Sequence, residues 1–267
     1  MARSVLRTCR ALAALVVFSG CRAADDTAQR SRRADAPRAQ IPVVPQAAPR
    51  AVASAVIVDN TGALVLDVWP LNVTPKLQME ETRRIVEHMH ADLALIPGFE
   101  RAALLASGDG SALVLVIAWH SDSEADSAST RLTGWLRISS DSVARRSTFG
   151  TTTSRVRIRR IVGTPPMLSD AAMIQLTRFA LKPGHSFDAL AMLADSNLSQ
   201  RVLQDTSAQG GATLAARDSG AVYVFLQARN ATALDADFRP DGPLPFWAPF
   251  AVRTESLMSV VAVVGRR

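Results

Sequence analysis

The side chains that could carry chemistry are few in this 267-residue sequence. His88 and His90 lie two positions apart in a predicted helix, so they point in different directions and make a poor metal pair. His185 stands in a Pro-Gly-His turn without a ligand partner nearby in sequence. The sequence contains no HExxH, CxxC or GxSxG motif and no phosphate-binding glycine loop. We therefore expect no metal and no cofactor, and the sequence assigns no catalytic residue.

Three arginines alternate along the segment 152–162, which is predicted to be a strand: Arg155, Arg157 and Arg159. One interpretation is a basic stripe that holds an anion. The other is a solvated strand face whose charges discourage pairing at the edge of a sheet. The sequence leaves both open.

The N-terminus has the three parts of a secretory signal peptide. Arginines are followed by the short apolar run 11–18 and then by Ser19-Gly20-Cys21. This end resembles the lipobox of bacterial lipoproteins, in which the cysteine becomes the lipidated first residue. The signal segment 1–21 ends at Cys21. Cys9 would be removed with the residues before Cys21, so Cys21 would be the one cysteine of the mature chain. The alternative is an ordinary cleaved signal with a chance cysteine.

Residues 22–50 are rich in Ala, Arg, Asp, Gln and Pro, and we predict a disordered tether there. Residues 51–267 contain 21 basic and 21 acidic residues, so the folded part is neutral. A neutral domain argues against nucleic-acid binding. The expected protein is exported and held on the periplasmic side of a bacterial membrane through lipid on Cys21, and Arg22 favours the outer membrane.

The remaining sequence predicts one order of elements twice, in residues 51–164 and 165–267. In the first half we predict strands at 63–69, 99–106, 112–119 and 152–162, with helices at 75–96 (capped by Thr74) and 122–128. In the second half we predict strands at 172–181, 210–216, 221–228 and 257–264, with helices at 186–203 and 230–238. A shift of 109 residues superposes the halves without a gap from residue 64 to 121.

Each half therefore has the βαββαβ order of ferredoxin-like units. We predict an α+β fold in which two such repeats pack sheet to sheet, so that one chain forms a barrel as a pseudo-dimer. A single large domain remains the alternative.

Pro97-Gly98-Phe99, the turn at Asp109-Gly110 and the segment from Trp119 to Ala125 resemble the antibiotic biosynthesis monooxygenase-like family of dimeric α+β barrels. The resemblance covers roughly residues 63–130. It implies either cofactor-independent oxidation of phenolic or quinone-like compounds or the opening of haem. The residues that family members use for haem are missing here, because the first strand has no Asn and residues near 128 and 138 are Ala and Ile.

Two functions follow. The first is a lipoprotein that binds a small apolar or aromatic ligand or a protein partner in a pocket between sheet and helices. The second is a cofactor-independent monooxygenase. In a third interpretation only the first half binds anything. Trp247, in a Pro-rich loop, is either a packed connection or part of a cover over the barrel mouth. The candidate pocket residues are Asp67, Trp69, Trp119, Arg178 and Trp247.

Overall fold

The computed structural model describes residues 55–58, 65–141, 153–204, 207–216, 218–229 and 247–266, of which 133–141 are described by their backbone alone. These residues all belong to one compact unit. The predicted signal peptide, Cys21, the tether and the helix predicted at 230–238 lie outside the described residues.

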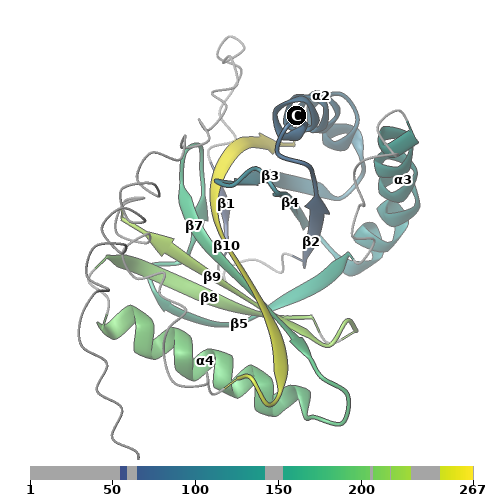
Figure 1. Ribbon diagram of the computed structural model, residues 1–267. Helices are drawn as coiled ribbons and strands as arrows, with labels where there is room; N and C mark the ends of the chain where they lie inside the picture. Colours follow the sequence, from purple (N-terminus) through teal and green to yellow (C-terminus); the bar gives the residue numbers. More distant parts are fainter. Residues whose placement is uncertain are drawn as a thin grey trace, which may run out of the picture. The chain divides into compact units, whose positions relative to one another are not determined.

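Eight antiparallel strands close into a barrel in the order β10-β3-β4-β2-β5-β8-β9-β7 (Figure 1). Their bounds are β2 Val65–Asn72, β3 Phe99–Ser107, β4 Ala112–Trp119, β5 Ser154–Gly163, β7 Met173–Leu181, β8 Ala208–Ala216, β9 Ala221–Ala228 and β10 Ala251–Gly265. Two short strands, β1 (Val56–Ile57) and β6 (Met167–Leu168), pair with each other outside the barrel ladder. The α+β prediction is thus confirmed.

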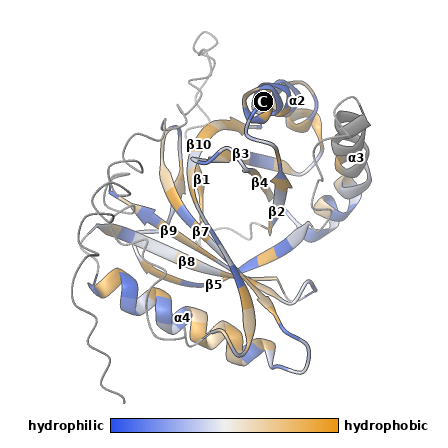
Figure 2. Ribbon diagram, viewed as in Figure 1, coloured by the Kyte–Doolittle hydropathy of each residue, from blue (hydrophilic) through white to orange (hydrophobic). Residues whose placement is uncertain are grey.

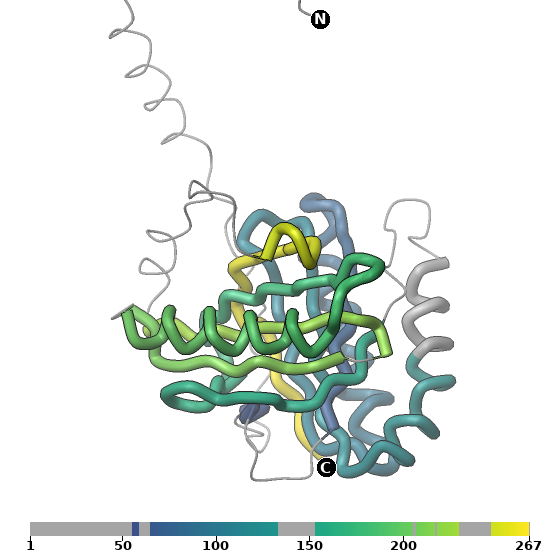
Figure 3. The backbone as a smooth tube through the Cα atoms, turned by 90° about the horizontal axis from the view of Figure 1, so that it is seen from below, coloured from purple at the N-terminus to yellow at the C-terminus, as the bar shows by residue number. Residues whose placement is uncertain are grey.

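The helices lie on the outside of this barrel (Figures 1 and 3). α2 (Gln78–Ala91), the short 3-10 helix η1 (Leu93–Leu95) and α3 (Asp122–Asp141) belong to the first half, and α4 (Phe187–Gln204) covers the strands of the second half. Among the described residues, no helix is both long and apolar enough to span a bilayer.

Strand alternation divides the core into a layer inside the barrel and layers beneath the helices. On β2, Leu66 and Val68 belong to the interior cluster, whereas Val65 and Leu71 pack beneath α2 and α3. A third cluster lies under α4. Both faces of the strands therefore carry apolar side chains along much of their length. Figure 2 shows hydrophobic residues in several of these strands.

The two halves have the same strand order. Strands of the first half run β3-β4-β2-β5, and strands of the second run β8-β9-β7-β10. Each final strand crosses to the other half, because β5 pairs with β8 and β10 pairs with β3. The arginine charges of β5 do not keep it at the edge of a sheet, because β2 and β8 flank it on both sides.

The gap-free shift of 109 residues is correct for one hairpin and wrong for the first strand. Strands β4 and β9 begin and end 109 positions apart. Asp67 pairs with Ile117 and Gln175 pairs with Leu226, so the equivalent positions on β2 and β7 differ by 108. A one-residue slip matters, because it moves a side chain to the opposite face of the sheet.

Three predicted boundaries also differ. Thr74 does not cap the first helix, which begins at Gln78 after a turn closed by the Leu77 N–H and the Thr74 carbonyl. Tertiary contacts override the local cap signal here, since the Gln78 amide donates to the carbonyls of Ser107 and Ala112. α3 continues to Asp141, and β10 begins at Ala251 because β7 offers it a partner over nine residues.

Candidate functional site

A cleft lies between α4 and the outer face of β7, β9 and β10. The space between its lining residues is about 290 Å³ only when the part open to solvent is counted, so it is an open cleft and not an enclosed cavity. The described residues that line it come from all four elements: Gln175, Thr177, Phe179, Asn197, Leu198, Arg201, Val224, Leu226 and Arg253. Apolar and polar side chains both contribute, which is typical of small-molecule sites.

Strand alternation places the cleft residues of β7. Ile174 and Leu176 belong to the cluster inside the barrel. Gln175, Thr177 and Phe179 consequently face α4, and Gln175 is only 2% exposed. Two polar side chains are therefore buried beneath a helix on a face that would otherwise be apolar.

Glu255 of β10 holds the polar side of the cleft together. Its Oε1 accepts hydrogen bonds from Gln175 Nε2 at 2.7 Å and from Thr177 Oγ1 at 2.9 Å. Arg253 donates to the other carboxylate oxygen, and Arg201 Nη1 of α4 lies 3.7 Å from Oε1. The Glu255 side chain is 10% exposed, so these contacts replace nearly all of its water.

Two buried polar atoms of this cluster have no hydrogen-bond partner among the described residues. They are the Oε1 of Gln175 and the Nε of Arg253. Buried polar atoms in native proteins are nearly always paired, so each unpaired atom requires an explanation. A ligand in the cleft that both residues line would supply one.

Two aromatic side chains, Trp247 and Phe179, lie beside the polar cluster. The Arg253 guanidinium lies 5.6 Å from the centroid of the Trp247 ring, and Phe179 lies 6.1 Å from the same ring at an interplanar angle of 56°. These distances permit cation–π and tilted aromatic contacts. Trp247, one of the five predicted pocket residues, thus contacts two residues that line the cleft.

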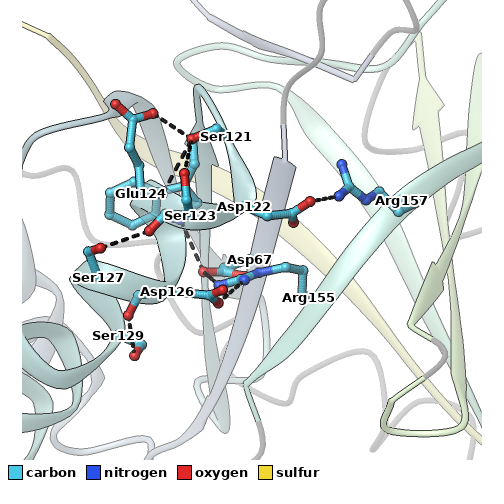
Figure 4. Close-up of polar contacts among 11 residues, drawn as sticks. Asp67, Ser121, Asp122, Ser123, Glu124, Asp126, Ser127, Ser129, Arg155 and Arg157 are labelled. Carbon is cyan, nitrogen blue, oxygen red and sulfur yellow. Dashed lines mark hydrogen bonds and ion pairs between the residues drawn. The ribbon is translucent and has the colours of Figure 1, made fainter.

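Asp67 and Trp119 meet in the first half, away from this cleft. The Trp119 indole donates to Asp67 Oδ2 at 3.0 Å, and Arg155 Nε donates to Oδ1 at 3.0 Å. Arg155 also pairs with Asp126 of α3 (Figure 4). Asp67 is 2% exposed and Trp119 is fully buried, edge-on to Phe99. The structure thus brings these two predicted residues together in a packed environment.

Burial has the largest effect on the pKa of Asp67. Desolvation raises the pKa of this carboxyl above its ordinary value, although the hydrogen bond and charge of Arg155 and the bond from Trp119 act to lower it. Burial also acts to lower the pKa of Arg155, but the contacts with Asp67 and Asp126 outweigh it and the pKa is raised. Asp67 therefore takes up a proton more readily than an ordinary aspartate, whereas Arg155 holds its proton more tightly than an ordinary arginine.

The other two predicted residues lie apart. Trp69 is half-buried against the cluster beneath α2 and α3, and its indole nitrogen has no partner among the described residues. Arg178 is half-buried and alternates with Thr177 and Phe179, so it lies on the barrel-facing side of β7. Neither residue is among those that line the cleft.

The arginine stripe on β5 contacts acids from three elements. Arg155 pairs with Asp67 and Asp126, and Arg157 pairs with Asp122 at the start of α3 (Figure 4). Arg159 Nε lies 2.7 Å from Asp195 Oδ2 of α4. Arg157 and Arg159 are exposed, as the solvated-face interpretation expects, and their ion pairs reduce the charge available to an anion. The carboxylates that neutralise the stripe lie on neighbouring elements, which sequence spacing does not show.

Sequence analysis missed Gln175, Thr177, Arg201, Arg253 and Glu255. A signal was present, because Gln175 and Thr177 alternate within an apolar strand, as do Arg253 and Glu255 in the stretch before the predicted last strand. Such alternation is normally a solvent-facing pattern. Only the placement of α4 shows that these residues are covered.

Solved structures of known proteins share this fold. The structure is similar to that of an anthrone oxidase-like protein, with a TM-score of 0.60 and 12% identity over 79% of this chain and 96% of that chain. It also resembles a protein of Fusobacterium nucleatum subsp. nucleatum provisionally named a monooxygenase, with a TM-score of 0.52, 8% identity, and 77% and 95% of the two chains covered. Such identities show a shared dimeric α+β barrel fold alone. No protein-family model and no curated protein matches the sequence.

Proposed function

We propose that this protein binds a small, partly apolar ligand in the cleft beneath α4. The observation that carries the proposal is the buried polar cluster around Glu255, in which Gln175 Oε1 and Arg253 Nε have no partner among the described residues and both residues line the cleft. Phe179, Leu198 and Leu226 provide an apolar surface on the same cleft. A ligand that covers both surfaces would pair the polar atoms and bury apolar area at the same time.

The same proposal assigns different roles to the two halves, which we infer to be βαββαβ repeats of a tandem duplication. Their identical strand order and reciprocal pairing of β5 and β10 support this inference. The first half fills the space under its helices with Trp119, Phe99 and the Asp67 ion pair. The second half leaves its space open, so we assign ligand binding to it. This differs from the interpretation in which only the first half binds.

Blocking the cleft tests ligand binding directly. Asn197 lines the cleft, and Gln200, three positions further along α4, is exposed. Asn197→Trp should fill the cleft and abolish binding of an aromatic probe in isothermal titration calorimetry, whereas Gln200→Trp should bind it like the unmodified protein. Equal binding by both variants, with both folded, would place the ligand elsewhere and refute the proposal.

We further propose that Cys21 carries lipid and holds the barrel at the outer membrane through the tether 22–50. The order of basic, apolar and small residues before Cys21 supports this. Cells grown with an alkyne-tagged fatty acid should label the protein, and Cys21→Ser should lose both the label and membrane fractionation. An unlabelled protein whose N-terminus begins at another residue would contradict the proposal.

A second candidate function is cofactor-independent oxidation of a phenolic or quinone-like compound. The observation that favours it is the fold shared with the anthrone oxidase-like protein. Oxygen uptake with a panel of hydroquinones and anthrones would separate the two functions. Sustained uptake that Asn197→Trp removes and Gln200→Trp keeps would establish an oxidase at the cleft. Binding without uptake would leave the ligand-binding function alone.

A further inference from the structure

The polar side of the cleft has an unmatched positive charge. Arg201 and Arg253 both contact the single carboxylate of Glu255, so two guanidinium groups face one anion among the described residues. Arg201 approaches that carboxylate only to 3.7 Å. Arg201 lines the cleft and its side chain is 28% exposed, so this guanidinium has donors beyond the contact with Glu255 to offer a ligand. A guanidinium recognises carboxylate oxygens especially well, because its planar fork matches them.

The Gln175 amide indicates a second group that a ligand of the cleft must carry, besides a negative charge. An ionised carboxylate can only accept hydrogen bonds, so the amide nitrogen of Gln175 must be the group that faces Glu255. This fixes the orientation of the amide and leaves Oε1 as a buried acceptor without a partner among the described residues. A ligand that satisfies Oε1 must present a donor such as a hydroxyl group.

We infer that the cleft selects an aromatic hydroxy acid. Its carboxylate would pair with Arg201 and Arg253, its hydroxyl would donate to Gln175 Oε1, and its ring would lie against the apolar side chains of the cleft. This inference rests on the proposed function, because it names the ligand class of the same site. It adds two requirements that an apolar pocket does not have, namely one negative charge and an adjacent donor.

Three related probes test both requirements in the unmodified protein. They are a naphthoate with a hydroxyl meta to its acid, the methyl ester of that compound, and the naphthoate that lacks the hydroxyl. Calorimetry should find the hydroxy acid bound at least about tenfold more tightly than its ester, which has no charge. The naphthoate without the hydroxyl should bind about fivefold more weakly than the hydroxy acid.

Variants assign these differences to residues. Arg201→Gln should lower the affinity for the acid toward that for the ester, because only Arg253 then faces the ligand carboxylate, and it should leave the affinity for the ester unchanged. Arg131→Gln, on the exposed surface of α3, is the matched control and should change neither. Gln175→Met should abolish the advantage of the hydroxyl. The comparison of acid with ester needs no variant, so it decides the charge requirement even if a variant fails to fold.

The outcomes separate this inference from the proposed function. If acid and ester bind the cleft equally, charge selection is refuted and ligand binding stands. If the acid binds more tightly than the ester but the naphthoates with and without the hydroxyl bind equally, the role of Gln175 as acceptor for the ligand hydroxyl is overturned. If none of the probes binds and Asn197→Trp changes nothing with any other aromatic compound, the proposed function fails together with the inference.

Discussion

The indole nitrogen of Trp119 donates a hydrogen bond of 3.0 Å to Oδ2 of Asp67, and both side chains are buried beneath α3 on adjacent strands. The bond closes a chain of contacts, because Asp67 also accepts from Arg155 of β5 and Arg155 pairs with Asp126 of α3. β5 leaves the first half at this point to pair with β8. The Asp67 cluster therefore joins the first sheet to the strand that closes one side of the barrel.

Trp119→Phe should destabilise the fold by more than the loss of aromatic area alone. The variant leaves Oδ2 of Asp67 with only the longer contact of 3.4 Å from Arg155 Nη2, and the loss of a hydrogen bond to a charged group costs about 1.5–3 kcal/mol. Trp69→Phe is the matched control, because the same ring is shortened and the Trp69 nitrogen has no partner among the described residues. Urea unfolding should show Trp119→Phe as the costlier change by about 1 kcal/mol or more. Equal costs would contradict a stabilising bond.

Asp67 should make the protein less stable as the pH rises. Its pKa in the folded protein is raised above the ordinary value of 3.8, so the folded state binds the proton more tightly than the unfolded chain. Stability attributable to this group therefore falls as the pH rises from about 4 through the raised pKa. Asp67→Asn removes this titrating group. Urea unfolding at a series of pH values should therefore show the free energy of unfolding of the unmodified protein falling, relative to that of Asp67→Asn, as the pH rises across this range.

Asp109 provides a control, because its contribution to stability should change with pH in the direction opposite to that of Asp67. Burial acts to raise its pKa, but hydrogen bonds from the Ser111 backbone and the hydroxyls of Ser107 and Ser111 outweigh it, and the pKa is lowered. The contribution of Asp109 is therefore present above pH 4 and lost as the pH falls through the lowered value. The difference between unmodified protein and Asp109→Asn should shrink on acidification. A drift of the same sign for both variants would contradict the assignment of Asp67.

Much of the barrel could be predicted from apolar patterns, whereas the site could not. β4 and β9 occupy the predicted residues because their continuous apolar runs follow tight turns. The cleft depends on which polar positions of β7 and β10 a helix covers, and that is a long-range property. The neutralised arginines of β5 show the same limit, since Asp122 and Asp195 lie at least 35 positions from their partners.

The register of β2 and β7 shows how an error of one residue in aligning the two halves conceals the cleft residue Gln175. A shift of 109 residues equates Asp67 with Leu176, which faces the inside of the barrel. The pairing partners equate Asp67 with Gln175, which lines the cleft. With the correct register, the buried polar position of the first half coincides with the unpaired amide of the second. Sequence comparison of the halves could not show this, because so few residues are identical.

Gly98→Ala should be strongly destabilising. Gly98 has a φ of +77°, and a Cβ there would lie 2.3 Å from the Cβ of Glu124. A left-handed conformation alone costs a residue with a side chain about 1–2 kcal/mol, and the clash at the start of α3 adds to this. Gly108→Ala is the control, because nothing lies within 4 Å of the place that its Cβ would take and its φ is not positive. In thermal unfolding, Gly98→Ala should have a melting temperature several degrees below that of the unmodified protein. The free energy of unfolding of Gly108→Ala should lie within about 0.5 kcal/mol of that of the unmodified protein.

Glu255→Gln should separate stability from ligand selection at the cleft. The substitution keeps the volume and one acceptor but leaves Arg201 and Arg253 facing each other without their shared anion. Breaking a buried ion pair costs about 3–5 kcal/mol, and the partial exposure of both arginines places the expected loss at the lower end, about 3 kcal/mol.

Glu100→Gln supplies the comparison for this last change. Glu100 is 30% exposed and approaches Arg266 and His120 only to 3.7 and 3.8 Å, so its loss should cost less than about 1 kcal/mol. Urea unfolding measures both. Because Glu255→Gln also adds a net positive charge to the cleft, a bound hydroxynaphthoate should stabilise this variant more than it stabilises Glu100→Gln. Equal losses for the two variants, with no difference in stabilisation by that acid, would show that Glu255 does not organise the polar side of the cleft.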